Sequence, residues 1–541
     1  MNKKTGSYVK GATILAAAGI LSRLLGLFFK VPLYHLVGSY GNGIYGNVTN
    51  IYNLLLMVST VGLPVAISKM VSENVAIKDF RAANNVFRIS FLVLVILGAL
   101  STAFLFLGGH FIIQLANWPK ESIYAIYAVA PAPLIISVCS AYRGFFQGYQ
   151  IMTPTAISQI MEQIIRVILG VFLCWYGVTI VGNIGAGVGG AVFGATAGGI
   201  LAAIFLGFLY VMFMRANRTK MQFSSRKKQL TNKAILKRLV KISIPVTLSS
   251  AIVSLFALID SFIYVSRLGV AGIDPHLATE MFGDYTNADL LVNIPLVISG
   301  TLAVAMIPAI SESFMIKDKK EMNKKIEIAI RLVVIVALPS CAGLAILSDG
   351  IFDILFRGSF YGPGILKFYA IAIIFLMLSN IFQSVLQAID RFKVPLYNLG
   401  VAIIVRFVCS WILLAIPSVN IKGLAFSSII TYAFLTLANY YSVKRVTKIK
   451  IKVNQTFIKP LISTVAMILV TIAIRNILRL VAGSLITVLF SMVVAVLTYA
   501  VMMIATGGIT ETEILYFPGK RVVLPIYNRI RGIRSESKEK K

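Results

Sequence analysis

The sequence predicts an all-α integral membrane protein with about fourteen transmembrane helices. Of its 541 residues, 58% are hydrophobic and only 13% are charged, and the mean hydropathy is +0.86. Soluble globular chains carry roughly a quarter charged residues, so this composition excludes a soluble multidomain enzyme. Apolar stretches of about 20 residues, long enough to cross the hydrocarbon core of a bilayer, recur along the whole chain.

The first stretch follows ten polar and basic residues and ends without a small-residue cleavage pattern, so we expect a transmembrane helix and not a cleaved signal peptide. The predicted spans are 12–36, 44–68, 86–107, 122–147, 154–178, 186–214, 239–266, 286–310, 327–348, 365–388, 396–416, 423–443, 457–480 and 485–506.

The basic residues orient these spans. The chain has 51 Lys and Arg against 20 Asp and Glu, a net charge of +31. The basic connections alternate with connections poor in Lys and Arg, which is the pattern of cytoplasmic loops beside anionic lipid headgroups and not of a nucleic-acid-binding protein. The basic segments are the N-terminus, 69–88, 215–241, 317–325, 391–393, 444–452 and 519–541. We therefore expect a multi-pass protein of the bacterial cytoplasmic membrane with both termini in the cytoplasm.

The opposite connections fit this orientation. The segment 178–190 carries no charge, and 267–289 sets one arginine against four acids. The one exception is the pair Arg475 and Arg479, near the end of the thirteenth span.

An internal repeat divides the chain. Residues near Pro64, Ser72 and Lys78 recur about 240 positions later near Ala303, Ser311 and Lys317, and Gln147, Pro154 and Arg166 recur as Gln387, Pro395 and Arg406. Six helices return the chain to its starting side, so the halves form a parallel repeat, a recurring transporter design. The predicted divisions are an N-lobe (1–214), a basic cytoplasmic loop (215–238), a C-lobe (239–445), a final helix pair (446–510) and a basic tail (511–541).

The sequence predicts a secondary transporter or facilitator and no enzyme. It contains no G-x-x-x-x-G-K-[ST] loop, so ATP hydrolysis by a P-loop is excluded. Its four cysteines lie singly in apolar stretches, and its three histidines are far apart, so we expect no disulfide, metal or cofactor. Coupling to Na⁺ or H⁺ stays open.

Ionisable residues inside spans are the candidate functional residues, because each is costly at mid-bilayer unless it faces a partner or water. Arg23 and Lys30 lie two helical turns apart, share a helix face and suit an anion such as a phosphate; alternatively, Lys30 reaches the outer interface and Arg23 caps a neighbouring helix. Glu162 and Arg166 have the spacing of an intrahelical ion pair, either structural or gating.

Two further ionisable residues complete the set. Arg406 has no acid at the equivalent position, so we expect it to bond across helices. Asp260 is the lone carboxylate of its span and is either a partner of Arg23 or a cation-coupling site. Glycines between 182 and 199 are interpreted as helix packing.

These motifs resemble a known family. The resemblance rests on three motifs: Ser22, Arg23 and Gly26; then Gly62 to Lys69; and above all Arg143, Gly144, Gln147 and Gly148 with Pro154 and the pair Glu162 and Arg166. In these motifs the chain resembles the stage V sporulation protein B and polysaccharide biosynthesis branch of the multidrug/oligosaccharidyl-lipid/polysaccharide (MOP) exporter superfamily. The layout is also similar to the MurJ-type lipid II flippases of that superfamily.

The resemblance implies two six-helix lobes, a central cavity, and a groove for a polyprenyl tail on the last two helices. It implies export of an undecaprenyl-diphosphate-linked sugar precursor by alternating access. Among such precursors, the resemblance favours lipid II, the precursor of peptidoglycan. The implied partners are this lipid-linked oligosaccharide, membrane lipids and cell-wall synthases, in growth or sporulation, with the transporter itself a monomer. Arg23 matches the arginine of the family's first-helix motif, whereas Phe29 and Lys30 stand where lipid II flippases place a second arginine.

Other functions fit parts of the pattern. A polysaccharide repeat-unit flippase would need the same cations. A cation-coupled multidrug antiporter of the same superfamily would need an accessible carboxylate, which the first three spans lack. A scaffold for cell-wall or spore-envelope synthases would depend on the basic loops and not on Arg23.

Overall fold

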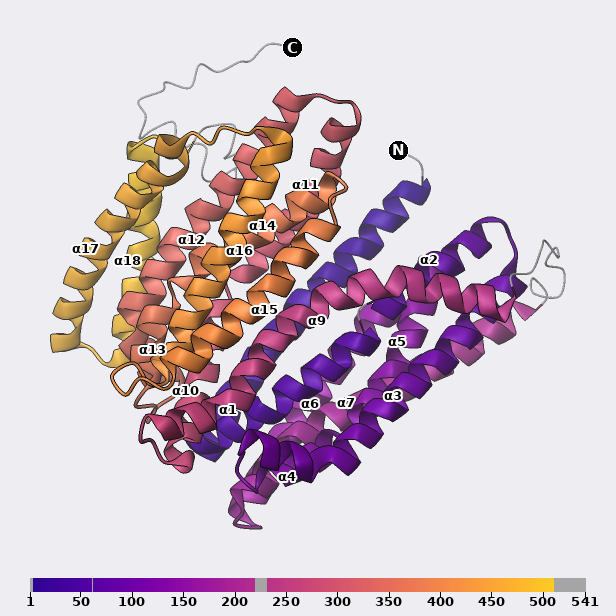
Figure 1. The fold of residues 1–541 in the computed structure, drawn as a ribbon, viewed down its shortest axis with the longest axis horizontal. Coiled ribbons are helices and arrows are strands. Elements are labelled where there is room, and N and C mark those ends of the chain that lie inside the picture. The colour runs from indigo at the N-terminus through magenta and orange to yellow at the C-terminus, as the bar shows by residue number, and fades with distance from the viewer. Residues whose placement is uncertain (1–2, 61, 219–230, 510–541) are drawn as a thin grey trace. The chain divides into compact units, whose positions relative to one another are not determined.

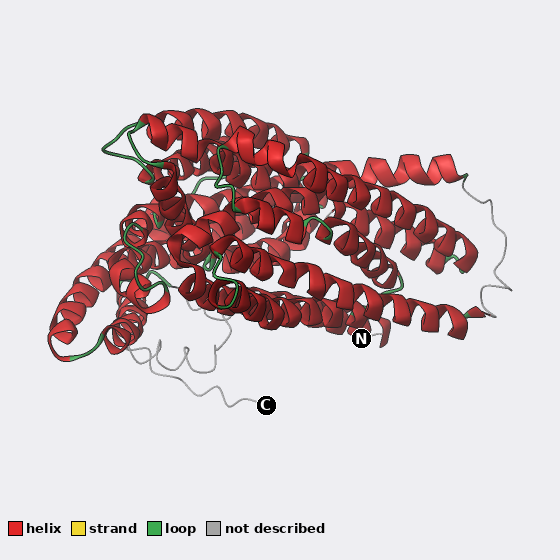
Figure 2. Ribbon diagram, turned by 90° about the horizontal axis from the view of Figure 1, so that it is seen from below, coloured by secondary structure: helices red, strands yellow, loops and turns green. Residues whose placement is uncertain are grey.

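The computed structural model describes residues 3–60, 62–218 and 231–509, and over these residues it consists of helices joined by short turns, with no strand (Figures 1 and 2). The predicted all-α fold class is therefore confirmed. The side chain of Arg23 lies outside the described part, as do half of the predicted basic loop 215–238 and the whole tail 511–541.

The helices follow one another closely along the chain. In chain order they are α1 (Lys3–Thr60), α2 (Gly62–Ala76), α3 (Phe80–Ala116), α4 (Ser122–Val129), α5 (Ala132–Gly148), α6 (Thr153–Thr179), α7 (Ile184–Ala216), α9 (Asn232–Val270), α10 (Pro275–Asn293), α11 (Leu296–Met315), α12 (Lys319–Leu355), α13 (Gly362–Tyr369), α14 (Ala372–Ala388), α15 (Lys393–Leu413), α16 (Lys422–Thr447), the π-helix η1 (Asn454–Ile458), α17 (Lys459–Val481) and α18 (Ser484–Ala505).

Each predicted span lies, within three residues, inside one helix or two consecutive ones, although several helices extend well beyond the predicted limits. By length and apolar composition, the described residues contain eleven candidate spans, or twelve if α13 and α14, bent by 44°, form one broken span. The first predicted span is joined to the second within α1, and the seventh lies in α9, where several side chains are outside the described part.

A glycine separates the first two predicted spans. Gly38 has φ 66° and ψ −170°, so the helical path of α1 breaks there. This left-handed region costs other L-residues energy but costs glycine little. The chain therefore turns at Gly38, within the short connection that the sequence predicts between residues 36 and 44.

The acidic connection after the seventh span is more ordered than the sequence predicts. Residues 267–289 are expected to form a loop, yet α10 begins at Pro275 and contains Glu280, Asp284 and Asp289. Asp274 accepts hydrogen bonds from the backbone N–H groups of His276, at 2.9 Å, and Leu277, at 3.2 Å. A carboxylate that caps the first amides in this way stabilises a helix start, which explains why this polar segment is helical.

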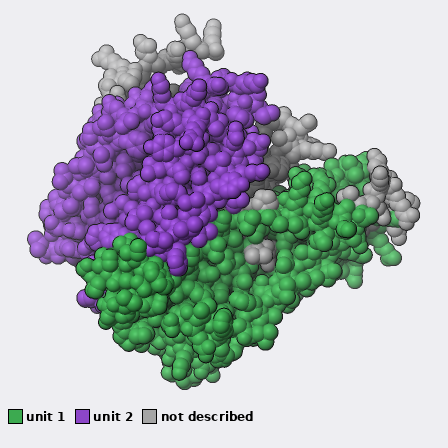
Figure 3. Space-filling view, in the orientation of Figure 1, with its two compact units in different colours: residues 1–286, 410–421 green, residues 287–409, 422–541 purple. Residues whose placement is uncertain are grey.

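The chain divides into two compact units, shown in separate colours in Figure 3. Unit 1 contains residues 1–286 and 410–421, and unit 2 contains residues 287–409 and 422–541. Helix α9 therefore belongs to unit 1, whereas the repeat places it at the start of the predicted C-lobe. The two compact units are defined by contacts within the structure, whereas the lobes are defined by the sequence repeat. The lobe limits therefore remain a prediction.

In unit 1, the small residues of α7 allow close contact with α6. A Cβ atom on Gly190 would lie 2.7 Å from the Leu173 carbonyl, on Gly194 2.7 Å from the Gly170 Cα, and on Gly198 2.5 Å from the Glu162 carbonyl. These glycines repeat every four residues and present one face, as in small-residue packing of membrane helices. The packing interpretation of the segment 182–199 is confirmed, and it fixes the backbone that carries Glu162.

In unit 2, α17 and α18 pack on α12, where Ile335, Met467 and Ala495 form a buried cluster with Tyr499. The Tyr499 hydroxyl donates to the Ile335 carbonyl at 2.8 Å. The last two helices are thus held against α12 by apolar contacts and by a buried hydrogen bond.

Candidate functional site

Four ionisable residues of unit 1 lie near one another where α1, α5 and α6 meet. They are Lys30, Arg143, Glu162 and Arg166, and we call them the cationic cluster. Three of them are positively charged, and all lie on helices that are long and apolar enough to cross a membrane.

Lys30 is buried, with 8% of its surface exposed. Its Nζ lies 4.4 Å from the centroid of the Tyr45 ring. Tyr45 follows the break at Gly38, so the turn brings the second half of α1 back over the first. The face of the Tyr45 ring stabilises this cation. The burial of Lys30 does not fit the alternative in which its side chain reaches the outer interface.

Glu162 pairs with Arg143 of α5 and not with Arg166, its predicted partner on the same helix. The Arg143 Nη2 lies 2.9 Å from the Glu162 Oε2, and both side chains are almost buried. Arg143 also donates from Nε to the Ser158 hydroxyl at 3.0 Å. Only a tight turn separates α5 from α6, so the two helices place these side chains opposite each other, which spacing along one helix cannot reveal.

Arg166 completes the cluster. The groups that interact electrostatically with its guanidinium are Tyr52, Glu162 and Tyr45. Its Nε is buried and has no hydrogen-bond partner among the described residues. The carboxylate of Glu162 therefore forms an ion pair with Arg143 and also interacts electrostatically with Arg166. Tyr45 interacts with both Lys30 and Arg166.

The other motif residues position Arg143. A Cβ on Gly144 would lie 3.0 Å from the Pro64 carbonyl, and one on Gly148 would lie 2.6 Å from the Val71 Cβ, so both glycines let α5 pack closely on α2. Pro154 lies in the first turn of α6, where its missing N–H costs nothing. Gln147 is half-buried at the end of α5.

Asp260 of α9 lies elsewhere in unit 1. It is 1% exposed and accepts a hydrogen bond from the Ser410 hydroxyl at 3.0 Å. The next residue, Ser261, donates to Asn47 at 2.8 Å. Asp260 is thus part of a polar connection between α9 and the end of α15, and a contact with Arg23 or a bound cation stays a prediction.

Arg406 lies in unit 2, apart from the cationic cluster. It is 3% exposed and donates to the hydroxyl of Ser428 on α16. The predicted bond across helices is confirmed.

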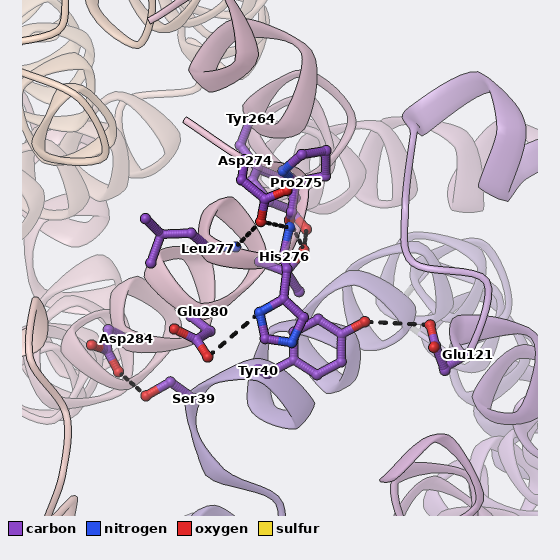
Figure 4. A network of polar contacts seen from close by, with 11 residues as sticks. Ser39, Tyr40, Glu121, Tyr264, Asp274, Pro275, His276, Leu277, Glu280 and Asp284 are labelled. Carbon is purple, nitrogen blue, oxygen red and sulfur yellow. Dashed lines mark hydrogen bonds and ion pairs between the residues drawn. The ribbon is translucent and has the colours of Figure 1, made fainter. Parts of the chain in front are cut away.

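A second polar network in unit 1 was not predicted (Figure 4). The Tyr40 ring stacks on His276 at 4.1 Å between centroids, and its hydroxyl donates to Glu121 at 3.3 Å. Ser39 donates to Asp284 at 2.7 Å. The one sequence signal is the pair His276 and Glu280, which are four residues apart; the His276 Nδ1 lies 3.7 Å from the Glu280 Oε1. No group of three metal-ligating residues with suitable geometry occurs in the described part of the chain.

This network ties three connections together. Ser39 and Tyr40 follow the break in α1, Glu121 precedes α4, and the other members belong to α10 or directly precede it. A Cβ on Gly283 would lie 1.9 Å from the Ser39 carbonyl, so glycine is required where α10 approaches the turn. The network therefore holds these three connections of unit 1 together.

Known proteins match both the sequence and the fold. The family model described as polysaccharide biosynthesis protein matches residues 8–314. Stage V sporulation protein B of Bacillus subtilis (strain 168) is 28% identical over 456 residues, which cover 84% of this chain and 86% of that protein. Lipid II flippase MurJ of the same organism is 25% identical over 485 residues, 86% of this chain and 88% of the flippase.

Two solved structures have the same fold. Lipid II flippase MurJ in an inward closed conformation has a TM-score of 0.65 at 18% identity and covers 91% of this chain and 98% of its own. An inward-facing multidrug resistance MATE family transporter of the MOP superfamily has a TM-score of 0.61 at 14% identity and covers 79% of this chain and 99% of its own. The family inferred from the motifs is confirmed: the chain belongs to the polysaccharide biosynthesis protein family, and it is similar along most of its length to stage V sporulation protein B and to MurJ.

Proposed function

We propose that this protein is a flippase that moves an undecaprenyl-diphosphate-linked sugar precursor, lipid II, from the inner to the outer leaflet of the bacterial cytoplasmic membrane. The observation that carries the proposal is the cationic cluster. Arg143 and Arg166 share the one carboxylate of Glu162, and Lys30 adds a third positive charge on a neighbouring helix. Excess positive charge on membrane-spanning helices is costly unless an anion or water meets it, and a diphosphate supplies two negative phosphates.

The chemistry of the two guanidinium groups supports a phosphate ligand. Guanidinium groups bind phosphate oxygens through paired hydrogen bonds. Arg143 is already held by Glu162 and Ser158. Arg166 keeps a buried Nε without a partner among the described residues, so it has donor capacity for a ligand.

An apolar groove on α1 and α6, two of the helices that carry the cluster, suits the lipid part of such a substrate. It has a volume of about 640 Å³, with Pro32 and Val167 among its lining residues. A lipid chain in this groove would lie along the same two helices that hold the cations. The groove predicted on α17 and α18 is the alternative place for the polyprenyl tail.

The same geometry argues against cation-coupled drug export as the main activity. That chemistry needs a carboxylate free to take up a cation or a proton. Glu162 is the carboxylate of the cluster, and it is bound to Arg143 at 2.9 Å. Asp260 is the remaining candidate for coupling, and it already accepts a hydrogen bond from Ser410.

The membrane potential can drive the proposed step. One elementary charge that crosses 100 mV changes its free energy by about 2.3 kcal/mol, so a headgroup with two negative charges gains roughly 4 to 5 kcal/mol on moving outward across an inside-negative potential. The gain applies if the cations of the protein stay in place while the substrate moves. Transport should then need no ATP.

The test is the accessibility of the precursor in cells depleted of the protein. A membrane-impermeant enzyme added outside cleaves only precursor that has reached the outer leaflet. Wild-type protein and Lys120→Gln, an exposed cation outside the cluster, should restore external cleavage. Equally expressed Arg166→Gln should not. If external precursor is unchanged by depletion in cells without a second flippase, the substrate is not lipid II, and another polyprenyl-linked glycan or a drug becomes the candidate.

A further inference from the structure

A polar pocket in unit 2 lies apart from the cationic cluster and is unused by the proposed transport step. It has a volume of about 500 Å³ and is formed by the ends of α12 and α17 and the start of α18. These three helices lie side by side (Figure 1). Its charged lining residues are Asp349 and Asp353 from α12 and Arg475 and Arg479 from α17.

The charges in this pocket are arranged in two separate pairs. Asp349 and Asp353 are one helical turn apart, and so are Arg475 and Arg479, so each pair presents one sign of charge. Among the described residues, one of these four side chains forms an ion pair: Asp349 lies 3.0 Å from the Nζ of Lys367, which is outside the pocket lining. Opposite charges therefore line one pocket without neutralising each other directly.

The arginine side of the pocket is prepared for an anion. Arg475 donates to the Ile346 carbonyl at 2.7 Å, which fixes its guanidinium, and its Nε is buried without a partner in the described part of the chain. Arg479 is exposed. Helix α18 begins at Ser484, also in the lining, and no side chain caps its first amides. Guanidinium groups and a helix N-terminus both favour a phosphate.

The aspartate side is prepared for a cation. Asp353 is exposed and has no ion-pair partner among the described residues. A ligand that fits both sides carries a phosphate and an ammonium group a few atoms apart. The phosphoethanolamine headgroup of a membrane phospholipid has this structure. Its acyl chains would extend along the exposed apolar surface of α17 and α18, which includes Leu480 and Leu485.

The sequence places the pocket at the outer leaflet. Arg475 and Arg479 lie near the outer end of the thirteenth predicted span, on the side where the sequence places fewer basic residues. We infer that this pocket binds the headgroup of an outer-leaflet phospholipid that carries both a phosphate and a primary ammonium group, phosphatidylethanolamine being the simplest.

The assignment is tested by native mass spectrometry of the purified, detergent-solubilised full chain with added phosphatidylethanolamine, phosphatidylcholine or phosphatidylglycerol. Wild type should bind phosphatidylethanolamine at least about 10-fold more tightly than the other two lipids. Arg479→Gln should weaken all three. Asp353→Asn should remove only the preference for phosphatidylethanolamine. Arg357→Gln, an exposed arginine just beyond α12, is the matched control and should bind as wild type does.

Two outcomes would overturn the assignment. One is equal binding of the three lipids by wild type and by both variants. The other is displacement of phosphatidylethanolamine from wild type by an equimolar undecaprenyl-diphosphate lipid, together with no such competition in Arg479→Gln. That result would make the pocket a site for the transported lipid. Because lipid binding is read without transport, a failure of the proposed flippase activity leaves this result intact.

Discussion

At the scale of single residues, the central feature is a carboxylate shared by two arginines. Glu162 pairs with Arg143 at 2.9 Å and interacts with Arg166 one turn along its own helix. Sharing leaves both guanidinium groups charged but incompletely neutralised. In this account, Arg143 serves to position Glu162, and Arg166 is the group that meets the phosphate.

This arrangement predicts coupling between Arg143 and Glu162. Arg143→Gln and Glu162→Gln should each lower the thermal stability of the purified protein, because each leaves an almost buried charge without its partner. The double variant should lose less than the sum, with an interaction energy of about 0.5 to 3 kcal/mol in a double-mutant cycle. Strict additivity in thermal unfolding would contradict the ion pair. The pair Arg166→Gln and Arg143→Gln should show weaker coupling.

At the scale of helices, the sequence predicts most of the elements and few of their contacts. Apolar length identifies the spans because the bilayer imposes it. The partner of Glu162 is not predictable from periodicity, since Arg143 reaches it from another helix. The first part of α10, residues 275–285, is missed because its polar residues resemble a loop, although Asp274 caps the helix. The pocket in unit 2 leaves only a faint signal, two arginines on the unexpected side.

Close packing of α6 and α7 predicts opposite effects for two glycine substitutions in one helix. Gly194→Ala should destabilise by about 1 to 3 kcal/mol, the usual cost of overpacking, since its Cβ would lie 2.7 Å from the Gly170 Cα and 2.8 Å from the Arg166 carbonyl. Gly207→Ala should stabilise by about 0.5 to 1 kcal/mol, because its nearest neighbour is the Tyr142 hydroxyl at 3.7 Å. Thermal unfolding of the two variants measures both changes in stability. A Gly194→Ala variant as stable as wild type would contradict the close packing of α6 and α7.

The break in α1 predicts a purely conformational effect. No atom lies within 4 Å of a Cβ built on Gly38, so Gly38→Ala meets open space but a positive φ of 66°. The expected loss is about 1 to 2 kcal/mol of stability. Gly400→Ala, which also meets open space but has no positive φ, is the control and should not destabilise. If both variants have the same thermal midpoint, the break at Gly38 is not maintained.

At the scale of the whole molecule, the account depends on a topology with both termini in the cytoplasm. Alternation of basic and non-basic connections predicts it, and the network around Tyr40 and His276 agrees, because its members come from connections that the sequence assigns to the outer side. Within unit 1 these connections contact one another (Figure 4). The family membership and the fold place the chain among transporters, while the ligand depends on the cationic cluster.

The topology is tested by labelling single cysteines in a chain whose four native cysteines are replaced. Ser418→Cys, exposed after α15, should react with a membrane-impermeant maleimide in intact cells. Lys319→Cys, exposed at the start of α12, should react only after permeabilisation. The reverse pattern would invert the proposed direction of transport.

The most direct test of the central claim is flipping by the purified protein in proteoliposomes. A fluorescent lipid II is quenched from outside by an impermeant reductant, so the fraction that becomes accessible reports transfer between leaflets. Wild type and Lys120→Gln should accelerate transfer over empty liposomes, and a potential negative on the donor side should increase the rate. Arg166→Gln should reduce transfer to the empty-liposome rate. Full activity of an equally folded Arg166→Gln, or no transfer by wild type of any undecaprenyl-diphosphate lipid, would contradict the account.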